Sequence, residues 1–201
     1  LPVTVSGVTA NRFCSSGLQT IAMAAQRVMT GECDAIVAGG LESMTAIPLG
    51  GNTFRPNPHL ADSYPDYYLN MGLTAENLAK KYEITREQAD EFSYNSHQKA
   101  LAAIKEGRFR DEIVPVRIPQ RKGDPVVFEQ DEFVRHGATL ASMSGLKPAF
   151  AKDGSVTAAN ASGINDGAAA VLVMLEARAA ALGLEPLARI RAYASAGLDP
   201  A

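Results

Sequence analysis

The stretch Asn11-Arg-Phe-Cys14-Ser-Ser-Gly-Leu18 lies between two different sequence patterns. Residues 2–8 before it are rich in valine, which predicts a β-strand. The apolar residues after it recur at the spacing of a helix: Leu18, Ile21, Ala22, Ala25 and Val28. The sequence therefore places Cys14 where a strand passes into a helix.

This position suits a nucleophile. Ser15 and Ser16 are candidates for the helix N-cap, and Gly17 allows close approach. A helix N-terminus carries partial positive charge and free N–H groups, so a thiolate at Cys14 would be stabilised. A lone cysteine is more often a small buried apolar residue. Local context alone leaves both the buried residue and the nucleophile open.

Composition limits the class of protein. The chain has 201 residues, of which 46% are hydrophobic and 20% charged, as in a soluble globular protein. The net charge of −3 provides no basic field for nucleic acid or an anionic membrane, and no apolar run is long enough to span a bilayer. Two cysteines indicate neither a disulfide framework nor a metal site, and they favour a reducing compartment.

The rest of the chain predicts a mixed α/β fold. The apolar run at 35–38, closed by two glycines, is typical of a buried parallel strand, so a βαβ unit is expected, followed by a long loop over 48–70. Further elements are expected as follows: a helix capped by Thr74, a helix opened by a Thr85–Gln88 capping box and ended by Gly107, strands at 113–118 and 126–128, a helix at 139–146, an apolar run at 168–175, a helix at 176–182 and a strand at 188–193.

Several longer motifs carry a family resemblance. They are the Cys14 segment, Gly31–Met44, Met71-Gly-Leu-Thr-Ala-Glu-Asn77, Arg135-His-Gly-Ala-Thr-Leu140, and Asn160-Ala-Ser-Gly-Ile-Asn-Asp-Gly-Ala-Ala-Ala170. In this order and approximate spacing, over nearly the whole chain, they resemble the thiolases, enzymes that cleave or form 3-ketoacyl-CoA.

The resemblance implies a domain organisation. The chain would be part of a thiolase-type layered α/β half, whose core residues are 1–47 and 164–186. An inserted α+β loop (lid) domain would cover 48–163, and a second half would start at 187–201. The family's first two strands and its C-terminal half would be missing. We therefore expect this polypeptide to be unstable alone or to be part of a longer protein.

The resemblance also assigns roles to single residues. Cys14 would be the catalytic nucleophile that takes up the acyl group. Arg135, Ser142 and Ser162 would contact coenzyme A, and Met71 would line the acyl pocket. Asn70 stands where acetoacetyl-specific thiolases commonly have histidine, which favours the degradative enzymes of broader chain length.

The family's acid/base groups are not matched. They are a histidine in a Gly-His-Pro segment and a second cysteine in a glycine-rich segment, and neither segment occurs here. His59, His97 and His136 do not match that histidine, and Cys33 is more typical of core packing. The fragment alone is therefore expected to be inactive.

Three functions remain open from the sequence. The first is a thiolase acyltransferase of fatty acid metabolism (β-oxidation) that uses acyl-CoA and coenzyme A as substrates, with no permanently bound cofactor. The second is a non-catalytic CoA-binding module, and the third is a cysteine hydrolase that pairs Cys14 with His136. The resemblance implies a homodimer or homotetramer. The expected location is the cytoplasm or an organelle matrix, because the cysteine content favours a reducing compartment.

Overall fold

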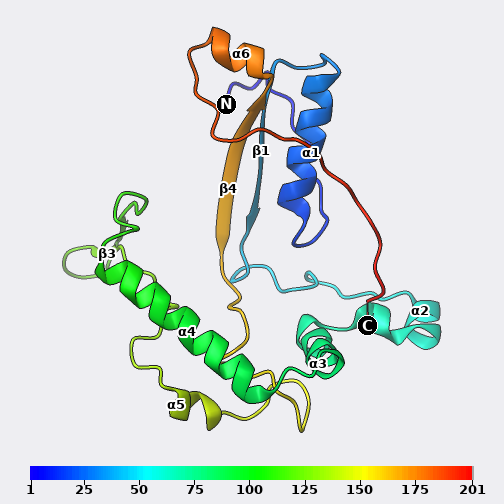
Figure 1. The fold of residues 1–201 in the computed structure, drawn as a ribbon. Helices are drawn as coiled ribbons and strands as arrows, with labels where there is room; N and C mark the ends of the chain where they lie inside the picture. Colours follow the sequence, from blue (N-terminus) through cyan, green and yellow to red (C-terminus); the bar gives the residue numbers. More distant parts are fainter. Residues whose placement is uncertain (201) are drawn as a thin grey trace. The chain divides into compact units, whose positions relative to one another are not determined.

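The computed structural model describes residues 1–200, which form two compact units (Figure 1). The first unit contains Leu1–Phe54 and Ile164–Leu198. The second contains Arg55–Gly163 together with Asp199 and Pro200. The chain therefore leaves the first unit after Phe54 and returns to it at Ile164.

The first unit is built on one helix and a two-stranded ribbon. Its elements are α1 (Ser16–Met29), β1 (Ala35–Glu42), β4 (Gly167–Met174) and α6 (Glu176–Ala181). β1 and β4 are antiparallel, in a register that runs from Ala35 opposite Met174 to Glu42 opposite Gly167. Figure 1 shows α1 alongside this ribbon. Helix α1 is confirmed, but the predicted parallel βαβ unit is wrong, because β1 pairs with a strand that follows more than a hundred residues later.

Two predicted strands do not form. Residues 2–8 and 188–193 contain no strand, and Val3 and Leu187 are fully exposed. A strand needs a partner to satisfy its N–H and C=O groups, and neither segment has one among the described residues. The prediction of a buried strand at 35–38 is also wrong in part, since only Ala38 of β1 is buried.

The second unit contains most of the helices. They are α2 (Pro58–Ser63), a 3₁₀ helix η1 (Pro65–Tyr68), α3 (Met71–Lys81), α4 (Arg86–Lys105) and α5 (Leu140–Ser144). A small antiparallel pair, β2 (Val116–Ile118) and β3 (Val126–Phe128), completes the unit. The long loop predicted over 48–70 therefore contains two short helices, the first capped by Asn57.

Local capping explains where these helices begin and end. The predicted Thr85–Gln88 capping box at the start of α4 is confirmed, and Gly107 follows the helix with a left-handed φ of 71°. Helix α5 also starts with a capping box, at Thr139. The predicted start of α3 is wrong, since Asn70 rather than Thr74 caps it, and the Asn70 side chain accepts a hydrogen bond from the Leu73 N–H at 2.9 Å.

The described chain exposes far more surface than its mass requires. Its accessible area is 16587 Å². Two separate domains of half this mass would expose about 11,000 Å² together by the usual scaling of surface with mass. Large apolar side chains make up part of this excess, including Phe13, Val37, Leu41 and Leu172.

Candidate active site

Cys14 follows a strained turn that leads into α1. The residue before it, Phe13, has a φ of 48°, in the left-handed region that non-glycine residues seldom occupy. The Asn11 side chain accepts a hydrogen bond from the Phe13 N–H at 2.9 Å. The Phe13 carbonyl in turn accepts from the Ser16 N–H at 3.0 Å and from the Ser16 hydroxyl at 2.7 Å. These bonds hold the turn in its unusual conformation.

The turn leaves Cys14 accessible at the start of a helix. Cys14 is exposed and directly precedes Ser15, the N-cap residue of α1. The Ser15 side chain makes no capping hydrogen bond, contrary to its predicted role, while the Ser16 hydroxyl accepts from the Arg12 N–H at 2.8 Å. Among residues 1–200 no group accepts a hydrogen bond from the Cys14 N–H. That N–H can therefore donate to an oxyanion formed beside the sulfur.

A second polar contact in the first unit joins the two segments that connect this unit to the rest of the chain. Asp166 accepts hydrogen bonds from the Thr45 N–H and the Thr45 hydroxyl, both at 2.9 Å. These bonds, led by the one from the backbone N–H, lower the pKa of Asp166. The contact fastens the segment after β1 to the segment before β4.

The second unit contains a groove of about 640 Å³. Arg135, His136 and Ser142 line it, together with Met143 and Leu146 from the α5 region and with Ala158 and Ala159. Two of the three predicted coenzyme A contacts therefore share one groove. The Arg135 guanidinium is exposed and makes no hydrogen bond or ion pair within the described part of the chain, so it is available to a ligand.

Two other polar groups of this groove have partners, and the exposed Glu132 side chain also lines it. The Ser142 hydroxyl donates to the Thr139 carbonyl at 2.8 Å and accepts from the Thr139 N–H at 3.0 Å. His136 Nε2 lies 3.2 Å from Gln130 Nε2. A ligand would therefore meet the Arg135 guanidinium, the Glu132 carboxylate and a serine that also holds the start of α5.

The remaining predicted residues lie outside this groove's lining. Ser162 is exposed and follows the segment that supplies Ala158 and Ala159. Met71 is the first residue of α3 and is 70% exposed. Cys33 is half-buried. The pairing of Cys14 with His136 involves residues of both units and stays a hypothesis.

Two further findings describe the chain between residues 1 and 200. None of its helices is both long and apolar enough to cross a membrane. Within the same residues, no three histidine, cysteine, aspartate or glutamate side chains are grouped in a way that could hold a metal ion.

Sequence reasoning missed a buried polar cluster beside the groove. Arg86 and Asp90 of α4 form an ion pair, and Asn160 donates to the same aspartate. Arg86 and Asp90 are four residues apart, which is the spacing of an ion pair on a helix. This spacing could have predicted the pair from the sequence. Asn160 belongs to the motif at residues 160–170, but the role predicted in that motif was for Ser162.

Comparison with known proteins identifies the family. The chain matches the family described as the thiolase N-terminal domain over residues 1–177. It therefore belongs to the thiolase family, and the resemblance read from its motifs is confirmed.

The individual relatives are bacterial enzymes. The chain is 56% identical to an acetyl-CoA acetyltransferase of Cupriavidus necator and 49% identical to a 3-ketoacyl-CoA thiolase of Bacillus subtilis, with all of the chain aligned in each case. The match covers 54% of the first protein and 53% of the second, so the chain spans about half the length of these curated relatives.

A solved structure supports the fold. The crystal structure of the Bacillus anthracis acetyl-CoA acetyltransferase matches with a TM-score of 0.74 and 44% identity, over 92% of this chain and 50% of that chain. The prediction of a mixed α/β chain from the first half of a thiolase is therefore confirmed.

Proposed function

We propose that the protein containing this chain is a thiolase-type acyltransferase in which Cys14 carries the acyl group. The observation that carries the proposal is the exposed Cys14 at the start of α1, in a segment that matches the family. Its substrates would be 3-ketoacyl-CoA and coenzyme A, and its products acyl-CoA and acetyl-CoA.

The proposed reaction has two steps. The Cys14 sulfur attacks the ketone carbon, and the oxyanion that forms accepts a hydrogen bond from the Cys14 N–H. The bond between C2 and C3 then breaks, acetyl-CoA leaves as an enolate that takes up a proton, and the acyl group stays on the sulfur. In the second step, the thiol of coenzyme A attacks this thioester, which releases acyl-CoA and restores the cysteine. The acid that protonates the enolate is not among the candidate residues of this chain.

The second unit would act as the lid that holds the acyl carrier. Its free Arg135 guanidinium suits a nucleotide phosphate, because guanidinium pairs with phosphate in a forked geometry. Ser142 in the groove and Ser162 beyond it would bond the polar parts of the carrier, and Met71 would face the acyl chain. Breakdown of fatty acids by β-oxidation and assembly as a dimer or tetramer belong to the same proposal.

Replacement of Cys14 by serine tests the function. In the full-length protein incubated with 3-ketoacyl-CoA, the wild type should gain the mass of one acyl group by intact-protein mass spectrometry. Cys14→Ser should form no acyl-enzyme and should keep its affinity for coenzyme A. Cys33→Ser is the matched control and should be acylated like the wild type. A Cys14→Ser protein that still turns over substrate normally would overturn the proposal, and coenzyme A binding without acylation in the wild type would favour the non-catalytic module.

A further inference from the structure

An ion pair on α4 lies beside the groove, between the buried Asp90 and the half-buried Arg86. Arg86 Nε lies 2.7 Å from the Asp90 carboxylate, and Asp90 is 3% exposed. A buried ion pair seldom stabilises a protein more than apolar side chains of the same size would. Its directional bonds do, however, fix the geometry of the groups they join. The partners of this pair therefore indicate what it holds in place.

The guanidinium of Arg86 holds the wall that belongs to α5. Arg86 Nη2 donates to the Met143 carbonyl at 2.7 Å and to the Leu146 carbonyl at 3.1 Å. Met143 belongs to the last turn of α5, where its carbonyl also accepts from the Leu146 N–H at 3.1 Å, and Leu146 follows the helix. Met143 and Leu146 also line the groove, so Arg86 bonds the backbone of that wall directly.

The carboxylate of Asp90 holds the part of the groove lined by Ala158 and Ala159, through Asn160. Asn160 Nδ2 donates to Asp90 Oδ1 and to the Ser155 carbonyl, both at 2.9 Å. Asn160 Oδ1 accepts from the N–H of Thr157, which is fully buried, at 2.7 Å. The turn formed in this way presents Ala158 and Ala159 to the groove.

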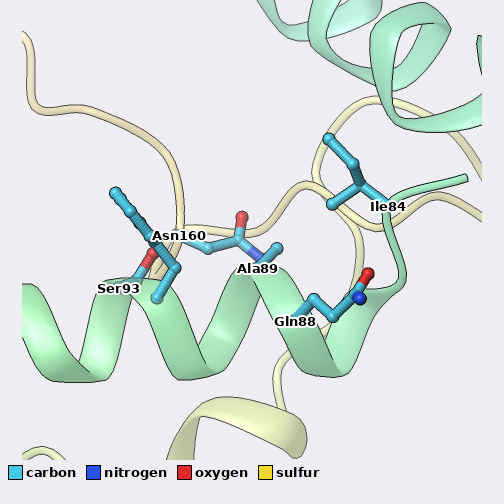
Figure 2. Close-up of a pocket in the computed structure, with 6 residues that line it drawn as sticks. Ile84, Gln88, Ala89, Ser93 and Asn160 are labelled. Carbon is cyan, nitrogen blue, oxygen red and sulfur yellow. The ribbon is translucent and has the colours of Figure 1, made fainter. Parts of the chain in front are cut away.

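Asn160 also packs directly on α4. It lines a smaller cavity of about 470 Å³ together with residues of that helix, and Figure 2 shows it beside Ala89 and Ser93. Helix α4 therefore provides the ion pair whose two members bond backbone or side chains of both lining segments.

We propose that Arg86, Asp90 and Asn160 are positioning residues for coenzyme A binding, and that they hold the two walls of the groove at a fixed separation. This inference rests on the proposed function, since it takes coenzyme A as the ligand of the groove. The three side chains lie beneath the walls and act through them, without touching the substrate.

Addition of one negative charge tests the inference in the full-length protein. Asn160→Asp places a second carboxylate against Asp90, so the two walls should separate. We expect the KM for coenzyme A in thiolysis, and its Kd by calorimetry, to rise about tenfold, with kcat changed less than about twofold. The double variant Asn160→Asp/Asp90→Asn restores a carboxylate–amide contact but removes the Arg86–Asp90 ion pair, so it should recover part of the lost affinity. Glu91→Gln is the control, because this neighbouring carboxylate on α4 is exposed.

Several results would overturn the inference. They are an Asn160→Asp protein that melts at a lower temperature but keeps the wild-type KM and Kd, a parallel loss of kcat and affinity that the double variant does not rescue, and a wild type that does not bind coenzyme A. If Asn160→Asp does not fold, Asn160→Ala replaces it, and an unchanged Kd then counts against the inference. Failure of the proposed function is distinguishable, because a wild type that binds coenzyme A without acylation overturns that function while the Kd values still test the positioning.

Discussion

The unusual turn before α1 places its backbone strain on Phe13 and exposes the side chain of the next residue, Cys14. Phe13 has the left-handed φ, and its side chain is 82% exposed, so no packing offsets the strain. Cys14 is the residue that the turn exposes before the helix begins. Strained backbone conformations of this kind persist where the surrounding bonds determine them. Here the Phe13 N–H donates to Asn11, and the Phe13 carbonyl accepts from Ser16.

The turn makes stability sensitive to the type of side chain at residue 13. A β-branched residue tolerates the left-handed region worst, and asparagine tolerates it well. We expect Phe13→Val to lower the free energy of unfolding by about 1 kcal/mol and Phe13→Asn to leave it equal or higher. Urea denaturation of the two variants provides the comparison. Equal stability of the valine and asparagine variants would show that the turn is not strained in solution.

Single residues were predictable where a local pattern determines them. The place of Cys14 at a helix start follows from the change of period at residues 11–18, and the structure has it there. The strain at Phe13 has no sequence signal, since phenylalanine is not a residue that favours a left-handed turn. The sequence also provided no reason to link Asn160 to Asp90, which lies 70 residues earlier and comes close only through the fold.

At the scale of elements, helices were predictable and strand pairing was not. Thr85 caps the start of helix α4, and Gly107 follows its end with a left-handed φ, so residues adjacent in sequence determine both ends. A strand depends on a second strand to pair with, and the local sequence pattern does not identify that second strand. This explains why β1 was expected in a parallel unit but pairs antiparallel with β4, and why residues 2–8 form no strand.

The contact that holds α3 should depend on pH. Glu76 of α3 accepts hydrogen bonds from the N–H groups of Ser155 and Val156, both at 2.9 Å, and from the Ser155 hydroxyl at 3.2 Å. Burial alone would raise the pKa of Glu76, but these bonds together lower it below the ordinary value. A lowered pKa in the folded state means that the carboxylate adds stability above the pKa of the unfolded chain, about 4.3 for glutamate.

Glu76→Gln should therefore lower the free energy of unfolding by about 1 kcal/mol at pH 7, a modest value because the side chain is only half-buried. The difference from the wild type should shrink as the pH falls below about 4.3 and vanish once Glu76 is protonated in the folded protein. Denaturant titrations between neutral and acid pH measure it, with Glu91→Gln as the control. A difference that stays constant down to acid pH would refute the charged contact.

At the scale of the whole molecule, the main feature is apolar surface that the described chain leaves uncovered. Ile36 and Ala38 of β1 alternate with Val37 and Leu41, so the two pairs lie on opposite faces of the ribbon. Ala38 is buried, whereas Val37 and Leu41 are 54% and 75% exposed. Leu172 lies opposite Val37 in the register and is 56% exposed. One face of the ribbon therefore presents large aliphatic side chains to solvent.

This open face should make the 201-residue chain associate when it is produced alone. Exposed apolar ribbons with free edges pair with other chains, because both the side chains and the unpaired backbone groups gain partners. We expect the isolated chain to enhance the fluorescence of 8-anilinonaphthalene-1-sulfonate (ANS) strongly and to elute above its monomer mass by size exclusion with light scattering. Val37→Thr with Leu172→Thr keeps β-branched or small side chains on the strands but removes the aliphatic patch, so both signals should fall. Val3→Thr with Val8→Thr likewise replaces two exposed aliphatic side chains with threonine, in the open N-terminal segment, and should alter neither signal. If the two double variants behave alike, association does not arise from this face, and another part of the exposed apolar surface drives it.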